Sequence, residues 1–298
     1  MSNPIPAINF DSLLPPAMAE KAENAGIVKA KMAFLPMFAL SVLAGAFIAM
    51  GAIFATTVTT GGSELTYGVA RVLGGLVFCL GLILVVVAGA ELFTGNNLIV
   101  MAWASGKVST SRLLRNWTIV YLGNFVGSVT TALGMFWSGQ YAFGDGAVGV
   151  NVLNIANHKV GLGFVEAIVL GIFCNALVCL AVWLCMSART TTDKILAILF
   201  PITAFVAAGF EHSIANMYFI PIGLFVKGGA DPAFWQMAGT TATSYGNLTW
   251  GTFLFNNLLP VTISNIIGGA VMVGLVYWLV YLKPNLVVAT REKVASMD

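Results

Sequence analysis

The sequence predicts an all-α membrane protein whose six transmembrane helices form two inverted three-helix repeats, with the second and fifth helices broken. Three observations support this prediction. The 298-residue chain is 58% hydrophobic and only 9% charged, whereas soluble proteins average about 25% charged residues. Uncharged runs recur along it, each long enough to approach a hydrocarbon core of about 30 Å. Two of these runs are interrupted by short polar stretches that resemble each other.

The uncharged runs define the predicted elements in order. The first span comes from a run without any charged residue, and the third, fourth and sixth are comparably apolar. The second and fifth elements are each divided by a charged residue. In neither element is one half alone comfortably long enough to cross the membrane. The expected spans are residues 32–63, 66–106, about 116–139, 161–188, 192–226 and about 255–282, which gives one transmembrane domain over 32–282 with repeats at about 32–140 and 161–282.

The segments outside these spans are polar. Residues 1–31 hold no long apolar core, so no cleavable signal peptide is expected. Apolar residues recur there at roughly helical spacing after Asp11, a candidate N-cap, and predict an amphipathic helix on the membrane surface or against the bundle; a poorly ordered polar tail is the alternative. The remaining predicted loops are one with Asp145, His158 and Lys159, one at the interface over 228–250, and the tail at 283–298.

Basic residues are distributed unevenly between the two predicted sides. The side that bears both termini carries Lys21, Lys29, Lys31, Lys107, Arg112, Arg115, Arg189, Lys194, Lys283, Arg291 and Lys293, and the other side carries Arg71, Lys159 and Lys227. By the positive-inside rule, both termini are therefore expected in the cytoplasm. The nearly balanced net charge of +2 gives no reason to expect a nucleic-acid partner.

Residues 209–216 place a carboxylate, an imidazole and an amide inside an apolar run, as Glu211, His212 and Asn216. Ionisable groups are expensive at that depth, so they mark a candidate functional site. For a lone histidine among apolar residues, a satisfied core position is an equally common alternative.

An imperfect copy lies at residues 89–96. It repeats the glycine, Glu91 and Asn96 at the same spacing, with Thr94 as its polar centre in place of His212. Both stretches predict a helix that ends at a glycine and restarts near the asparagine, so that unpaired N–H groups and the positive end of the helix dipole point to mid-depth. Two such ends favour a small anion over a cation, and His212 could give it a hydrogen bond or a proton.

Three charged residues near these stretches have two interpretations each. Glu91 and Glu211 could accept hydrogen bonds from the backbone of their own loops or relay protons, and the structural role is favoured. Lys159 could draw anions into a pore mouth or be a solvated surface lysine. The four cysteines lie in apolar runs without Cys-x-x-Cys spacing, so we expect no metal, disulfide or cofactor.

Shorter matches extend the repeat. Asn124 and Gly127 of the third span share the Asn-x-x-Gly spacing of Asn265 and Gly268 in the sixth. Each match could be only a close helix contact of the small-residue type, but their common order favours a repeat. Three spans per repeat place the repeats in opposite orientations, with a substrate path at their interface.

Three stretches in this order, residues 87–95, 171–181 and 209–216, resemble the formate/nitrite transporter family. The Phe-Asp-Ser-Leu-Leu-Pro-Pro-Ala-Met-Ala run at 10–19 and the His-Lys pair at 158–159 look most like its formate channels. The resemblance covers nearly the whole chain.

The resemblance implies an aquaporin-like protomer with its own pore, in a homopentamer of the bacterial inner membrane. The family's central histidine matches His212, and the threonine that faces it across the pore matches Thr94. Its vestibule residues match Lys159 and Asn175, with Asn265 a further polar candidate. Apolar constrictions are implied at Phe78, Leu82 and Phe205 toward the cytoplasm, and at Leu92 and Val178 toward the outside.

The sequence therefore predicts a channel for formate and similar small monovalent anions, in which a proton from His212 lowers the cost of crossing apolar constrictions. Nitrite or hydrosulfide channels of the same family are alternatives, as is a neutral-solute pore of the water or glycerol type. An intramembrane enzyme using His212 and Ser213 is disfavoured because adjacent side chains on a helix point apart. A haem subunit is disfavoured as well, because haem would need paired axial ligands. The expected partners are the anion, lipid and further copies of the chain.

Overall fold

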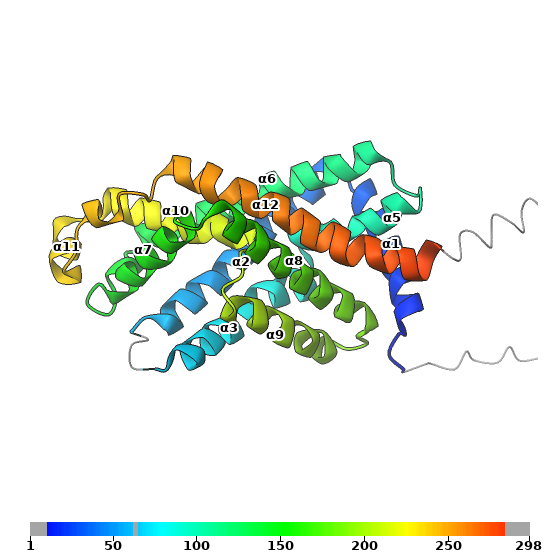
Figure 1. Ribbon diagram of the computed structural model, residues 1–298, viewed down its shortest axis with the longest axis horizontal. Coiled ribbons are helices and arrows are strands. Elements are labelled where there is room, and N and C mark those ends of the chain that lie inside the picture. Colours follow the sequence, from blue (N-terminus) through cyan, green and yellow to red (C-terminus); the bar gives the residue numbers. More distant parts are fainter. Residues whose placement is uncertain (1–10, 62–64, 284–298) are drawn as a thin grey trace, which may run out of the picture.

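The structure is a computed structural model that describes residues 11–61 and 65–283, and the regular structure in these ranges is helical throughout. Both ends of the described chain lie at one end of the molecule, near α1 and α5, whereas α7 and α11 lie at the opposite end (Figure 1). The first half contains α1 (Pro15–Lys31), α2 (Phe34–Thr59), α3 (Tyr67–Ile83), η2 (Leu84–Gly89), α4 (Phe93–Asn96), η3 (Asn97–Ile99), α5 (Val100–Ala104) and α6 (Thr110–Trp137). The second half contains η4 (Gln140–Ala142), α7 (Ala147–Val160), α8 (Phe164–Ser187), α9 (Thr191–Ala207), α10 (Ser213–Gly229), α11 (Pro232–Ala238), η5 (Ala242–Tyr245), η6 (Thr252–Leu258), α12 (Leu259–Ile266), η7 (Ile267–Leu275) and η8 (Trp278–Leu282).

Several helices have the length and composition of membrane spans. Within the described ranges five qualify, namely Phe34–Thr59, Tyr67–Gly89, Thr110–Trp137, Phe164–Ser187 and Thr252–Leu282. The fifth element, which the sequence predicts to be broken, contains two shorter helices, α9 and α10, of 17 residues each.

The expected second and fifth elements are each interrupted by a non-helical stretch. We call these stretches the first break (residues 90–92, before α4) and the second break (residues 208–212, before α10). Gly89 and Gly209 have φ angles of 83° and 78°. This left-handed conformation costs glycine little and other residues more, so a glycine is suited to turn the chain out of each helix.

Helix starts differ from the sequence prediction. α1 begins at Pro15 with Leu14 as its N-cap, so Asp11 is not the cap, and proline fits the first position because its missing N–H has no partner there. α4 and α10 begin at Phe93 and Ser213, three residues before the asparagines expected at their starts.

Two segments expected as loops contain short helices. The connection between the halves holds α7, and the segment over 228–250 holds α11 and η5. All three are shorter than a membrane span, so the hydropathy pattern gave no sign of them.

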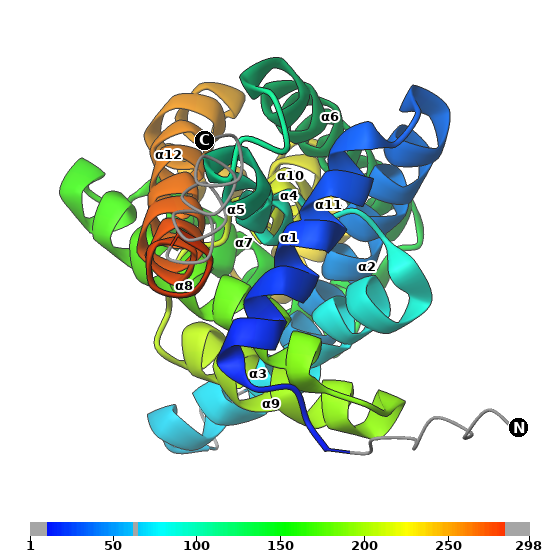
Figure 2. The same cartoon turned by 90° about the vertical axis from the view of Figure 1, so that its right-hand side faces the viewer.

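α1 packs against the rest of the protein. Met18, Ala22 and Glu23 are buried on one side of it, and a Cβ added at Gly26 would come within 3.3 Å of Ala102 Cβ. Figure 2 shows α1 crossing the end of the molecule beside α5. Of the environments expected for this segment, the structure shows the one against the bundle.

Two glycines allow close helix crossings. A Cβ added at Gly127 of α6 would clash with the carbonyl oxygen of Val42 in α2, and one at Gly268 of η7 would clash with that of Ile172 in α8. Backbones approach this closely only where a residue lacks a side chain. The Asn-x-x-Gly motifs therefore are helix contacts through their glycines, while their asparagines contact the breaks.

Candidate functional site

His212 and Thr94 come from opposite halves of the chain and meet inside the protein. Thr94 Oγ1 lies 2.9 Å from His212 Nε2, and both side chains are buried. His212 is the N-cap of α10, and its Nδ1 accepts a hydrogen bond of 3.1 Å from the N–H of Ala215. Because Nδ1 accepts, the ring proton is on Nε2 and is donated to Thr94 Oγ1. The threonine hydroxyl keeps its own proton for another acceptor.

These two residues do not occupy equivalent positions in the two halves. His212 is the residue before α10, as Leu92 is the residue before α4. Thr94 lies one residue inside α4 and corresponds to Ile214. The expectation that Thr94 replaces His212 in the first copy is therefore wrong, and each half contributes a different position.

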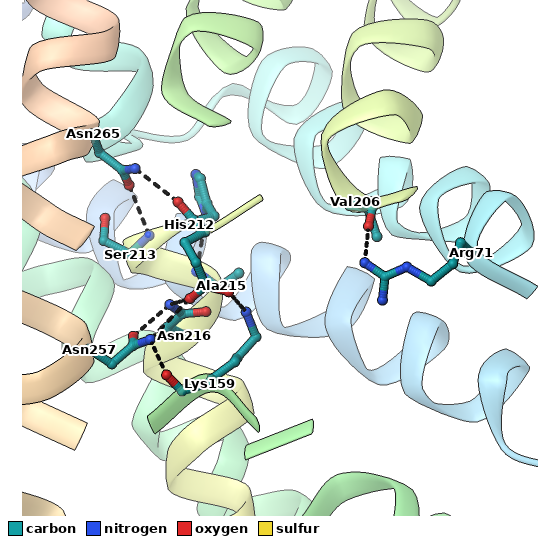
Figure 3. A network of polar contacts seen from close by, with 10 residues as sticks. Arg71, Lys159, Val206, His212, Ser213, Ala215, Asn216, Asn257 and Asn265 are labelled. Carbon is teal, nitrogen blue, oxygen red and sulfur yellow. Dashed lines mark hydrogen bonds and ion pairs between the residues drawn. The ribbon is translucent and has the colours of Figure 1, made fainter. Parts of the chain in front are cut away.

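Polar side chains surround the carboxylate of Glu211 at the second break. Lys159 Nζ lies 2.6 Å from Glu211 Oε1, and Oε2 accepts hydrogen bonds from Asn216 at 2.7 Å and Asn257 at 3.0 Å. Asn257 also donates to the backbone carbonyl of Lys159 and accepts from Asn216. Figure 3 shows Lys159, Asn216 and Asn257 gathered beside His212. The network holds Lys159 in place, while Oδ1 of Asn216 is buried without a hydrogen-bond partner among the described residues.

The first break has the same network with different residues. Lys29 Nζ lies 2.6 Å from Glu91 Oε1, and Asn96 donates to Oε2 at 2.7 Å. Asn116 accepts from Asn96 at 3.0 Å and donates to the backbone carbonyl of Lys29 at 3.2 Å. α1 and α7 thus supply equivalent lysines, so the correspondence between the halves begins one helix earlier than expected.

An asparagine bridges each break. Asn265 donates to the carbonyl of Glu211 at 3.0 Å and accepts from the N–H of Ser213 at 2.9 Å. Asn124 makes the two equivalent bonds across the first break, at 2.9 Å each. One side chain thereby satisfies a donor and an acceptor that the missing helical turn leaves unpaired.

The hydrogen-bond partners of Glu91 and Glu211 differ from those expected for a structural role. Their carboxylates accept from lysine and asparagine side chains, and their own N–H groups donate to the carbonyls of Leu40 and Leu170 in the neighbouring helices. Loop backbone was expected as the donor, but the bridging asparagines satisfy it.

A cavity of about 150 Å³ adjoins His212. Its wall includes Phe78, Lys159, Phe205 and Arg71, and the rings of Phe205 and His212 are stacked with centroids 5.8 Å apart. A wider hollow of about 620 Å³ shares Arg71 with the cavity and reaches α11. These spaces form an approach from the α11 end of the molecule to the histidine.

The aromatic residues in the wall of this approach lie on a different side of the protein from the one expected for them. Its wall includes Arg71 and Lys159, the basic residues assigned to the outer side. Phe78 and Phe205 therefore lie on the same side as these basic residues, and not on the opposite side as expected.

The apolar residues expected on the outside lie toward the other end. Leu92 follows Glu91, whose lysine partner belongs to α1 at the end that bears both termini. Val178 lies past the middle of α8, toward Ser187, whose hydroxyl donates to the carbonyl of Leu13. Relative to the expectation, Phe78 and Phe205 have exchanged sides with Leu92 and Val178; Leu82 is not part of this exchange.

The other expected site residues surround Thr94 rather than the cavity. Asn175 donates to the carbonyls of Thr94 at 3.3 Å and Asn265 at 2.6 Å. Leu82 is buried in the same apolar core as Leu92. None of these side chains lines the cavity or the wider hollow, so Asn175 is not found in the vestibule expected for it beside Lys159.

The sequence reading missed Lys29, Asn116, Asn257 and Arg71 as parts of the site. Lys29 and Lys159 both lie in the last turn of a short helix that precedes a long apolar helix, which is a shared signal. Repeats that begin at residues 32 and 161 leave both lysines out.

The chain is similar to known proteins over most of its length. A family model described as "Formate/nitrite transporter" matches residues 16–279. The "Formate channel FocA" of Escherichia coli (strain K12) is 48% identical over 276 residues, which cover 93% of this chain and 97% of that protein. The "Formate channel FocA" of Haemophilus influenzae is 41% identical over 263 residues, covering 88% and 93%. The solved structure "Pentameric formate channel with formate bound" superposes with a TM-score of 0.80 at 46% identity, covering 84% of this chain and 98% of that one.

Proposed function

The chain belongs to the formate/nitrite transporter family, as its three motifs predicted, and we propose that it is a membrane channel conducting formate and related small monovalent anions. The observation that carries the proposal is the Thr94–His212 contact, where hydrogen-bond donors from two helix starts meet at the end of an apolar approach. Relatives named formate channels support the choice of anion.

The proposed architecture is six spans in two inverted repeats, with α3–α5 as the broken second element and α9–α10 as the broken fifth. The matched networks around Glu91 and Glu211 support it, because equivalent contacts lie toward opposite ends of the molecule. A solved neighbour described as pentameric supports a homopentamer.

We place the protein in the bacterial inner membrane with both termini in the cytoplasm. Basic residues gather at the end that bears both termini: burial lowers the pKa of Lys21 from its usual value, and repulsion from Lys194 and Arg189 adds to this effect. Such clustering is typical of a cytoplasmic face.

In the proposed mechanism the anion enters by the outer approach and passes Phe78 and Phe205. At the centre the anion accepts a hydrogen bond from the hydroxyl of Thr94. This hydroxyl can donate to the anion because its oxygen acts as the acceptor for His212 Nε2–H, which leaves its own proton without an acceptor. The inner constriction is formed by Leu82, Leu92 and Val178. Apolar side chains at both constrictions strip water from the ion, which makes these donors decisive for passage.

Passage together with a proton is a further part of the proposal. While Nδ1 of His212 accepts from Ala215, the ring holds one proton, and loss of that proton from Nε2 would leave an anionic ring. The histidine therefore acts as a proton donor only after Nδ1 takes up a proton and releases Ala215. The neutral acid then crosses the apolar constrictions at lower cost than the anion.

Proteoliposomes distinguish this function from its alternatives. We expect formate flux well above that of empty liposomes, with water permeability close to the empty control. Water or glycerol flux without formate flux would move the protein to the neutral-solute class. Faster nitrite or hydrosulfide flux would keep the mechanism but change the physiological anion.

A further inference from the structure

We infer that Arg71 forms an outer binding station for the small carboxylate anion, ahead of the constriction at Phe205. This inference rests on the proposed function and adds the residue that captures the anion before it loses water. The sequence reading gave this task to Lys159.

The position of Arg71 is the first support. Arg71 lies on α3 and is part of the wall of both the inner cavity and the wider hollow, together with Thr59 and Ile155. An anion that moves from the hollow to His212 therefore passes its side chain. Lys159 also lines the inner cavity, and Figure 3 shows Arg71 well apart from Lys159, beside Val206.

The hydrogen bonds of the guanidinium are the second support. Nε donates to the carbonyl of Ala207 at 3.1 Å, and Nη2 donates to that of Val206 at 2.7 Å, at the C-terminal end of α9. These bonds use one edge of the guanidinium. The other edge, formed by Nη1 and the second N–H of Nη2, has no hydrogen-bond partner among the residues the structure describes. It is a planar fork, fixed in place, of the kind that binds a carboxylate through two parallel bonds.

The charge balance is the third support. The charge of Lys159 is compensated by Glu211 at 2.6 Å, so this pair gives little net field. Arg71 belongs to none of the ion pairs formed within the described ranges. Asp145 lines the outer part of the hollow and opposes an approaching anion. Of the two lysine or arginine residues that line these spaces, Arg71 is thus the one without an ion-pair partner in the described part of the chain.

Formate uptake into right-side-out vesicles tests the inference. In Arg71→Gln, glutamine keeps one donor for α9 but loses the charge and the fork, so the half-saturating external formate concentration should rise about tenfold at low salt. The maximal rate should stay within about twofold, since the central site is untouched. Arg71→Lys, which keeps the charge without the fork, should lie between parent and Arg71→Gln.

Two further variants separate local charge from general effects. Asp145→Asn should lower the half-saturating concentration, and asparagine suits the φ of 54° found there. Lys227→Gln removes a charge from a residue that lines neither space and should match the parent. The difference in half-saturating formate concentration between the parent and Arg71→Gln should become smaller as the Debye length falls from about 30 Å at 0.01 M salt to about 8 Å at 0.15 M.

The outcomes are distinguishable. If the parent conducts formate and Arg71→Gln saturates at the same concentration with the same salt dependence, the inference is overturned while the proposed function stands. An equal rise in Lys227→Gln would also overturn it. Absence of formate flux in the parent overturns the proposed function and this inference with it.

Discussion

Replacing Lys159 alone should destabilise the protein more than replacing Lys159 and Glu211 together. The two charged groups are 2.6 Å apart, with side-chain exposures of 13% and 3%. The carboxylate also accepts from Asn216 and Asn257, so its partners are all inside the protein. Removing one member of a buried pair leaves an uncompensated charge at a cost of about 3–5 kcal/mol, whereas neutral replacements of both are often tolerated.

The magnitude follows from the partners that remain. In Lys159→Met the carboxylate keeps two asparagine donors, so we expect the lower end of that range, about 3 kcal/mol. At about 2–4 °C per kcal/mol for a chain of this size, the midpoint of thermal unfolding should fall by about 6–12 °C. Glu211→Gln should lower it similarly, and the double variant, being less destabilised than either single variant, should recover more than about 3 kcal/mol relative to the sum of the single effects.

The cysteines provide the assay. Cys79, Cys174, Cys179 and Cys185 are all free and buried. A dye that fluoresces on reaction with thiols therefore reports unfolding of the purified protein in detergent. Single effects that add within about 0.5 kcal/mol would refute the reasoning, because they would show that the two groups do not depend on each other.

Three further predictions concern single positions. Gly127→Ala should prevent stable folding, whereas Gly134→Ala on the same helix, where an added Cβ meets nothing within 4 Å, should unfold at or slightly above the parent temperature in the thiol assay. Phe205→Ala should raise water permeability and admit larger carboxylates in proteoliposomes, because it removes the ring that stacks on His212 in the cavity wall; unchanged selectivity would argue against an outer constriction there. Thr94→Val keeps the shape but removes the free donor, so formate flux should fall by about tenfold or more, while a parental rate would show that the hydroxyl does not contact the anion.

Much of the fold follows from hydropathy and from glycine. The uncharged runs locate α2, α6 and α8 because a bilayer requires long apolar helices, and Gly89 and Gly209 mark the breaks because they adopt positive φ. The short amphipathic helices are different. α7 has 14 residues and is too short to span a membrane, so a search for long apolar runs does not find it.

The candidate site was predictable in its residue types more than in its contacts. Glu91, Glu211 and His212 stand out because charged or titratable groups are rare in apolar runs. Their partners do not stand out, because a lysine or asparagine such as Lys29 or Asn257 is ordinary at a helix end. Which end a phenylalanine faces depends on tertiary position, which explains why Phe205 lies on the side of Lys159 and not on the opposite side as expected.

The central claim is that the anion passes the Thr94–His212 contact, and formate flux in His212→Asn tests it most directly. Asparagine is a good N-cap and can still accept from Ala215, but it is too short to reach Thr94 as the imidazole does. We expect this variant to unfold at the parent temperature while its formate flux falls about tenfold and loses its dependence on pH. His212→Phe, which loses the cap as well, should also be less stable. A His212→Asn channel with the flux and pH profile of the parent would contradict the account.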